Sequence, residues 1–258
     1  THAAADKIEA AQARFERADM LMQVGLDRGD SSLMDAVITD FQALLLRLDS
    51  AYEPVTYGRV ELRLAMAHIW KGQIEANTAS LSTGIAMLSR EDETLDYEHS
   101  PLDWVAHKQA LALGLQALSE LTANPELHEK ALQVYDLALK RPLQAGLVLA
   151  SQLRHNRAAC LVAHAESQTD LKALDKAEAV FKAELRTTKP ATDPVAWAIL
   201  QTHLARLYIA RGDLTGFVME ATEAAYALEA AQEIFTEHHL SDLARLAMAQ
   251  MTRVRTEA

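Results

Sequence analysis

The residue types that most often carry catalysis are present in this chain, but they form no recognised catalytic motif. The sequence contains no phosphate-binding loop, no dinucleotide-binding glycine fingerprint, no His-Glu-x-x-His motif and no Gly-x-Ser-x-Gly elbow. The best metal-site candidate is the triplet Glu237-His238-His239. Neighbouring side chains on a helix point about 100° apart, so adjacent histidines seldom bind one ion. We therefore interpret the triplet as a polar turn before the last helix.

The only cysteine is also interpreted as structural. Cys160 lies in the apolar stretch AACLVA, and no base and orienting residue accompany it in the sequence. Such a thiol is typically buried rather than nucleophilic. The ten histidines are scattered over several segments and form no convincing metal-ligand set. We therefore expect no enzymatic activity, no metal and no cofactor, with an all-α enzyme as an alternative.

Composition and charge narrow the class of partner. The net charge of −11 disfavours binding to nucleic acid or to an anionic membrane surface, because both need a basic face. Half of the residues are apolar, while nine glycines and six prolines are few for 258 residues, which favours long helices. No 18-residue apolar run is present, so no transmembrane helix is predicted. We expect a cytoplasmic protein, with a periplasmic one after leader removal as the alternative.

An internal repeat organises the whole sequence. Alanines recur at intervals of 47, 47, 46 and 47 residues, at Ala18, Ala65, Ala112, Ala158 and Ala205. Nineteen residues after each alanine comes a small or medium apolar residue: Val37, Gly84, Ala131, Ala177 and Ala224. Four residues further comes a large apolar one: Phe41, Leu88, Tyr135, Phe181 and Leu228. This register predicts five copies of one helical hairpin whose repeated positions pack inward.

Prolines and glycines mark the ends of the expected first helix of each copy. Eleven residues before the alanines are Lys7, Pro54, Pro101, Leu147 and Pro194, and seven residues after them are Gly25, Gly72, Ser119, Ala165 and Gly212. Because proline suits a first helical turn and glycine suits a helix end, each copy should open with a helix of about 18 residues. A short polar connector such as 122–126 follows, and then a second amphipathic helix such as 129–140 or 175–185.

The pattern resembles tetratricopeptide repeats. Leu204, Ala205 and Tyr208 match the spacing of the family's first helix, and Ala177 and Phe181 match its second helix. The period of 46–47 residues is longer than the family's usual ~34, and the family's proline after the second helix is irregular here. The sequence PLDW at 101–104 looks like the longer, bacterial-type repeats.

The resemblance implies an all-α fold, a right-handed α-α superhelix in one domain over residues 1–258. Its five hairpins would span residues 6–52, 53–99, 100–145, 146–192 and 193–239, and a capping helix at 240–256 would close the open end.

The resemblance also implies a concave partner-binding groove lined by the first helices. By register, that groove would contain Arg59, Arg63, Met66, Gln109, Gln116, Gln152, His155, Asn156, Thr202, His203 and Arg206. Neighbouring lining positions would be Leu62, Ile69, Ala106, Leu113, Val162, Ile199 and Ile209. The three arginines favour an acidic or C-terminal peptide segment, because guanidinium groups donate forked hydrogen bonds to carboxylates. Alternatively, the arginines are solvated or pair with neighbouring Asp and Glu.

These observations predict a non-catalytic scaffold that binds a protein or peptide segment. A second hypothesis is a sensory or regulatory module of a larger signalling enzyme or transcription regulator, because the chain opens with Thr1 rather than methionine. The identity of the partner and the oligomeric state are not encoded in these patterns.

Overall fold

The fold is all-α, as expected. A computed structural model describes residues 2–90, 95–141, 147–216 and 218–257, and within these ranges it contains eleven helices and no strand. The helices are α1 (His2–Arg28), α2 (Ser31–Leu45), α3 (Pro54–Ile74), α4 (Thr78–Leu88), α5 (Pro101–Thr122), α6 (Pro125–Leu139), α7 (Leu147–Gln168), α8 (Leu171–Thr187), α9 (Pro194–Thr215), α10 (Val218–Glu237) and α11 (Ser241–Glu257).

The chain divides into two compact units, each described by itself below. Unit 1 comprises Thr1–Gly146 with α1 to α6, and unit 2 comprises Leu147–Ala258 with α7 to α11. The boundary lies at the expected start of the fourth repeat, residue 146, so the division respects the repeat. The single domain over residues 1–258 stays a prediction.

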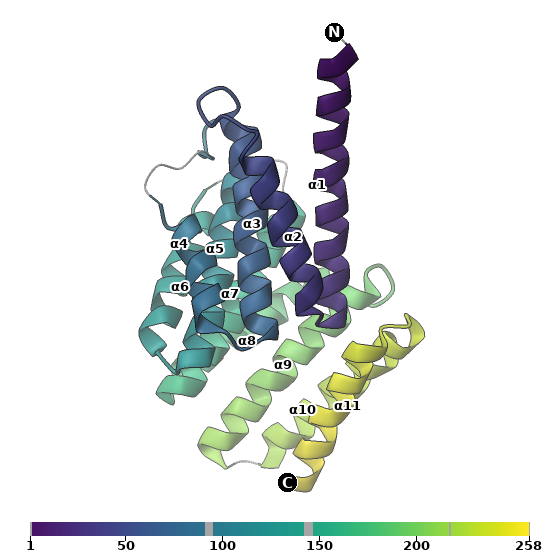
Figure 1. Cartoon of the computed structure of the whole chain (residues 1–258). Helices are drawn as coiled ribbons and strands as arrows, with labels where there is room; N and C mark the ends of the chain where they lie inside the picture. The colour runs from purple at the N-terminus through teal and green to yellow at the C-terminus, as the bar shows by residue number, and fades with distance from the viewer. Residues whose placement is uncertain (1, 91–94, 142–146, 217, 258) are drawn as a thin grey trace. The chain divides into compact units, whose positions relative to one another are not determined.

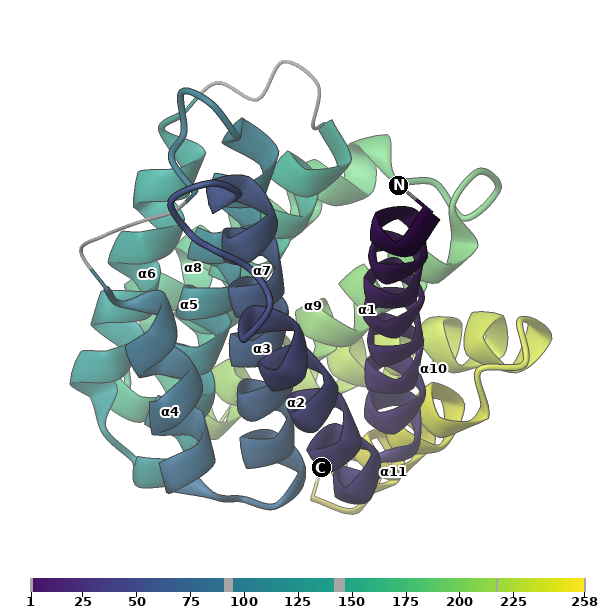
Figure 2. The ribbon, with the colours of Figure 1, turned by 45° about the horizontal axis from the view of Figure 1, so that its top comes forward.

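Within each unit, helices pack against their neighbours in the chain (Figures 1 and 2). In unit 1 each helix from α1 to α6 contacts the next, and the first helices α1, α3 and α5 also contact one another in that order. In unit 2 the same holds from α7 to α11, with a further contact between the first helices α7 and α9. Such a pattern is compatible with hairpins stacked side by side.

The repeated apolar positions form the core. The five recurring alanines, from Ala18 to Ala205, are all 0% exposed. The large residues 23 positions further on, from Phe41 to Leu228, are buried as well, and so are the small residues four positions before them. Burial of apolar side chains contributes about 25 cal/mol per Å² removed from water, so these positions supply much of the stabilisation of each hairpin. The register read from the sequence therefore predicted the core residues correctly.

Each hairpin reverses direction through one residue in the left-handed conformation. Positive φ angles occur at Gly29 (62°), Ala76 (50°), Ala123 (50°), Thr169 (56°) and Gly216 (72°), which again are 47, 47, 46 and 47 residues apart. In the first four hairpins the next residue is Asp30, Asn77, Asn124 or Asp170, whose side chain accepts hydrogen bonds from the first turn of the second helix. One left-handed residue and one N-cap therefore make the whole connection.

The expectation that glycine ends the first helices was wrong. Gly25 and Gly72 lie inside helices that continue for three and two more residues, to Arg28 and Ile74, and Gly212 lies inside α9, which ends at Thr215. Their carbonyl oxygens close the turn instead: Asp30 N donates to Gly25 O, and Asn77 N donates to Gly72 O, both at 2.8 Å. This six-to-one bond is the Schellman arrangement, in which the left-handed residue comes four positions later.

Two glycines are needed for close helix contact rather than for the turn. A Cβ at Gly72 would lie 2.7 Å from the side chain of Leu81, and one at Gly84 would lie 2.6 Å from the carbonyl oxygen of Ala65. The second of these contacts joins α4 to the anchor alanine of α3. Backbone cannot move aside as a flexible side chain can, so Gly84 fixes how closely the two helices approach.

Helix α11 packs against α10 at the end of unit 2, where a capping helix was expected. Ala244, Ala247 and Val254 are buried, whereas Leu246 and Met248 are about half exposed, at 52% and 49%. The helix is therefore amphipathic but leaves part of its apolar surface in solvent.

The left-handed turn residues predict a stabilising substitution. Ala76→Gly should raise the free energy of unfolding by about 1 kcal/mol, because the left-handed conformation strains an alanine Cβ but not glycine. Ala86→Gly is the matched control: Ala86 is also exposed in unit 1 but lies within α4, where glycine should cost about 1 kcal/mol. Urea unfolding followed by circular dichroism measures both. A shift of the same sign for the two variants would contradict the turn assignment.

The close approach at Gly84 predicts a destabilising substitution. Gly84→Ala should lower the free energy of unfolding by about 1–3 kcal/mol, because overpacking against the backbone of α3 outweighs the gain in helix propensity. Ser82→Ala, at an exposed position of the same helix, should change stability little or raise it. Thermal unfolding of the two variants beside the parent chain is the measurement. Equal or greater stability of Gly84→Ala would show that α4 has room to move.

Candidate functional site

Unit 1 contains a hollow on its first helices, which we call the first-helix hollow. It has a volume of about 390 Å³ and is lined by one residue of α1, four of α3 and five of α5: Phe15, Arg59, Leu62, Arg63, Met66, Asp103, Ala106, Gln109, Ala110 and Leu113. Seven of these were expected to line a groove: Arg59, Leu62, Arg63, Met66, Ala106, Gln109 and Leu113. Gln116, another expected lining residue, is one turn further along α5 and donates to Glu120 at 3.2 Å.

The three arginines of the expected groove are all paired with carboxylates of neighbouring first helices. Arg59 of α3 donates to both carboxylate oxygens of Asp103 in α5, at 2.8–3.0 Å. Arg63 lies 3.1 Å from Asp19 of α1. In unit 2, Arg206 of α9 donates to Glu166 of α7 at 2.8 Å.

The pairing changes the chemistry of the surface. The hydrogen bond with Asp103 raises the pKa of Arg59 above its ordinary value, so this guanidinium stays charged and occupied. A carboxylate of a partner would have to displace Asp103, Asp19 or Glu166 before it met a free arginine. The alternative in which the arginines pair with neighbouring acids is thus what the structure shows, and the preference for an acidic segment loses its basis.

The remaining expected residues of unit 2 are arranged around a histidine pair. His155 of α7 and His203 of α9 lie edge to face with ring centroids 4.5 Å apart, and His203 stacks on Phe181 of α8 at 5.8 Å. Thr202 donates to the carbonyl of Ala198 within its own helix. Asn156 is half-buried beside His155, whereas Gln152 is exposed. The structure therefore brings two of these residues together, and they pack on a core aromatic.

Burial keeps both histidines neutral. Burial, together with smaller contributions from the neighbouring His155 and Arg206, lowers the pKa of His203 to about 3. Burial also lowers the pKa of His155, against the opposing effect of Glu184. Neutral imidazoles can pack as aromatic rings, so the pair serves the contact of α7, α8 and α9 at neutral pH.

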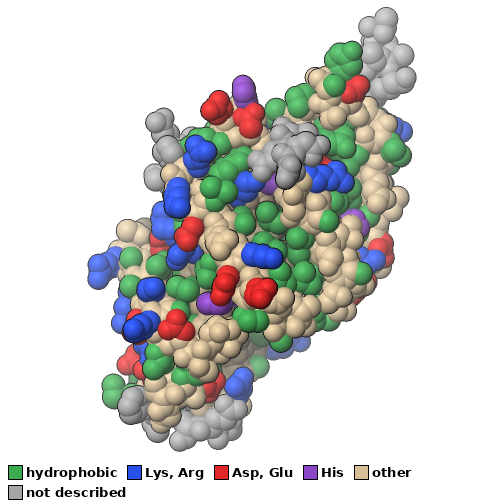
Figure 3. Space-filling view, turned by 90° about the vertical axis from the view of Figure 1, so that its left-hand side faces the viewer, with side chains coloured by type: hydrophobic (Ala, Val, Ile, Leu, Met, Phe, Trp, Pro, Cys, Tyr) green, Lys and Arg blue, Asp and Glu red, His purple; other side chains and the backbone are tan. Residues whose placement is uncertain are grey.

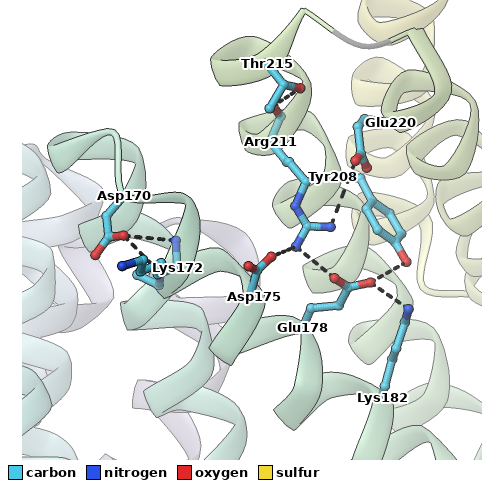
Figure 4. A network of polar contacts seen from close by, with 10 residues as sticks. Asp170, Lys172, Asp175, Glu178, Lys182, Tyr208, Arg211, Thr215 and Glu220 are labelled. Atoms are coloured by element: carbon cyan, nitrogen blue, oxygen red, sulfur yellow. Dashed lines mark hydrogen bonds and ion pairs between the residues drawn. The ribbon is translucent and has the colours of Figure 1, made fainter.

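An ion-pair network in unit 2 was not predicted from the sequence (Figure 4). Arg211 of α9 contacts Glu178 and Asp175 of α8 at 2.8 and 3.0 Å, and it approaches Glu220 of α10 at 4.0 Å. Glu178 also accepts from Lys182 and from the hydroxyl of Tyr208. Burial alone would raise the pKa of Glu178, but the hydrogen bonds from Lys182 and Arg211 lower it. The network joins three helices, and Arg211 at its centre is only 14% exposed.

A buried serine–histidine pair occurs at the turn between α5 and α6. The Ser119 hydroxyl donates to the carbonyl of Asn124 and lies 2.9 Å from Nδ1 of His128. Ser119 is 1% exposed and His128 is 4% exposed. Because the hydroxyl proton is already directed at the backbone and solvent does not reach the pair, the arrangement stabilises the turn rather than activating a nucleophile.

The remaining residues considered for catalysis or metal binding lie in the core or in a turn. Cys160 is buried, as expected. His238 and His239 follow the end of α10, and His239 has a positive φ of 59°, so this triplet forms the turn before α11. Among the described residues, no group of three or more His, Cys, Asp or Glu could hold a metal ion.

Figure 3 shows the charged and apolar side chains on one face of the molecule. Basic and acidic side chains are interspersed there with apolar ones. Within the part of the chain that the structure describes, no helix is long and apolar enough to cross a membrane.

The chain was compared with protein-family models and with curated proteins. No protein-family model matches the chain, and no curated protein matches its sequence. The likeness to tetratricopeptide repeats therefore rests on the residues of this chain alone.

The buried histidine pair predicts acid sensitivity. Unfolded His203 would titrate near pH 6.5 but the folded form near pH 3, so between these values the unfolded state binds more protons. Stability is therefore complete above pH 6.5 and falls as the pH is lowered through this window. Between pH 7 and pH 5, His203 should lower the free energy of unfolding of the parent chain by about 2 kcal/mol. We expect this decrease to be absent in His203→Phe, which keeps an aromatic ring.

Urea unfolding of the parent chain and the variant at both pH values checks this prediction. His238→Gln, an exposed histidine of the same unit, is the control and should leave the pH dependence unchanged. If His203→Phe lost as much stability on acidification as the parent chain, His203 would have to titrate normally in the folded protein.

Proposed function

We propose that this chain is a non-catalytic scaffold of tetratricopeptide-like hairpins, and that it binds a segment of another protein in the first-helix hollow of unit 1. The observation that carries the proposal is the make-up of that hollow. It draws residues from three successive first helices, α1, α3 and α5, and its position follows from the repeat register. Repeat proteins of stacked hairpins offer such surfaces to partner segments.

The lining indicates what kind of segment fits. Met66 and Leu113 supply apolar contacts that are half-buried without a partner, and methionine adapts its shape to different ligands. The side-chain amide of Gln109 forms no hydrogen bond with the described residues, so it is free to donate to and accept from a peptide backbone. The flanking arginines are neutralised by Asp103 and Asp19. We infer an uncharged or weakly charged segment with at least one apolar side chain.

Affinity capture with two matched double variants tests the proposal. The full chain is used as bait, together with Met66→Ala/Gln109→Ala in the hollow and Leu137→Ala/Gln133→Ala on α6. Leu137 and Gln133 are exposed on a second helix, and the control pair likewise truncates one large apolar residue and one glutamine. Captured proteins are identified by mass spectrometry, and their affinity is then measured with purified components.

The hollow variant should weaken binding at least tenfold, which corresponds to ~1.4 kcal/mol, because truncating central contact residues typically costs this much or more. The α6 variant should bind like the parent chain. A partner that binds both double variants equally well would remove the first-helix hollow as the binding site.

A further inference from the structure

A second and larger hollow lies beside the first-helix hollow, between α1 and the α2–α3 corner. We call it the α1–α3 hollow. Its volume is about 1110 Å³, and its lining is Ala11, Gln12, Phe15, Leu44, Arg47, Leu48, Glu53, Thr56, Arg59 and Val60. Helices α1 and α2 are closest at the turn that joins them and diverge toward their other ends (Figures 1 and 2). The hollow lies between these diverging ends and α3.

The floor of this hollow is the uncovered margin of the unit 1 core. Leu44 and Val60 belong to the buried core cluster, while Phe15 and Leu48 pack against it and remain partly exposed. The leucine at the equivalent position of the next repeat is covered, unlike Leu48. Leu95, the equivalent of Leu48 one repeat later, is only 2% exposed. The α1–α3 hollow therefore leaves open an apolar position that the next repeat covers.

One ring of the floor packs against the core. The ring of Phe15 lies edge-on to the ring of Phe41, with centroids 5.6 Å apart, and Phe41 is 0% exposed. A side chain held against a buried aromatic cannot collapse into the hollow to fill it. The apolar surface is therefore formed before any ligand arrives, which reduces the entropic cost of binding.

Among the described residues, one arginine at the rim has no carboxylate partner. Arg17 on α1 lies 3.4 Å from Asp40, and Arg59 is held by Asp103. Arg47 lines the hollow without a carboxylate partner among the described residues. The nearby acid, Glu53, is the N-cap residue of α3, where the helix dipole favours a negative charge. Within the described part of the chain, the rim thus carries Arg47 without an ion pair and the acid Glu53, above an apolar floor.

We propose that the α1–α3 hollow binds a single-chain amphiphile with a carboxylate head group, for which a free fatty acid is the simplest example. The alkyl chain lies on the apolar floor, and the carboxylate accepts hydrogen bonds from Arg47. Small-molecule sites share this make-up, an apolar cavity of roughly 300–1,000 Å³ with few polar groups that orient the ligand. The two hollows adjoin and share Phe15 and Arg59, but Met66 and Gln109 line only the first-helix hollow and Arg47 lines only the α1–α3 hollow, so variants at these positions test the two proposals separately.

Isothermal titration calorimetry with dodecanoate, below its micelle concentration, tests the proposal on the full chain. We expect saturable binding of one molecule per chain. Decanoate should bind roughly fourfold to fifteenfold more weakly, because each buried methylene contributes about 0.8 kcal/mol, a factor of roughly four. Dodecyltrimethylammonium, with the same chain and a cationic head, should bind at least tenfold more weakly than dodecanoate.

Variants then place the ligand. Arg47→Gln should weaken dodecanoate about tenfold, as expected for losing a hydrogen bond to a charged group, whereas Arg28→Gln should have no effect. Arg28 is an exposed arginine of unit 1 that does not line the hollow. Ala11→Trp should weaken dodecanoate binding by placing a bulky ring in the hollow, and Leu48→Gln provides a second test of the floor. Circular dichroism and the melting temperature confirm that each variant is folded.

Four results would overturn the proposal. One is the absence of saturable dodecanoate binding, and another is equal affinity for the cationic amphiphile. The third is binding that survives both Ala11→Trp and Leu48→Gln in folded protein. The fourth is equal loss of affinity in Arg47→Gln and Arg28→Gln, which would indicate attraction by general charge and not a head-group site.

Discussion

The fold depends on a reversal of the chain that takes only two residues. A residue in the left-handed conformation ends each first helix, and in four hairpins Asp or Asn at the next position caps the second helix. So short a connection allows little freedom in how the two helices face each other. Gly84 can therefore lie against the carbonyl of Ala65, and the recurring alanines and large apolar residues are all buried.

The sequence was sufficient to predict the helical class and the buried positions. Apolar spacing identified Ala112, Tyr135 and Phe181 as core residues because a repeat reports the same physical requirement five times, so the errors of single positions cancel. Helix ends were harder. Glycine was taken as the end of the helix, yet Gly72 serves a close contact, and the left-handed position four residues later is Ala76. Without a glycine there, composition gives no signal for that conformation.

The sequence predicted which residues line the candidate site but not the ion pairs that they form. Register placed Arg59 and Met66 at one hollow, since it fixes which faces of the helices coincide. It did not reveal that Arg59 pairs with Asp103, 44 residues away, because the partner depends on side-chain reach between two first helices. The Arg211 network was not predicted for the same reason, because its acidic residues come from α8 and α10. Both hollows of unit 1 are consequently less basic than their sequence indicates.

The ion pairs of unit 2 differ in their exposure to solvent, so added salt weakens some of them more than others. Arg206 is 40% exposed in its pair with Glu166, whereas Arg211 is 14% exposed in its contact with Glu178. Dissolved ions weaken interactions between exposed charges, with a screening length of about 10 Å at 0.1 M salt, but act weakly on groups withdrawn from water. Added salt will therefore loosen the electrostatic link between α7 and α9 first, while the link from α9 to α8 persists.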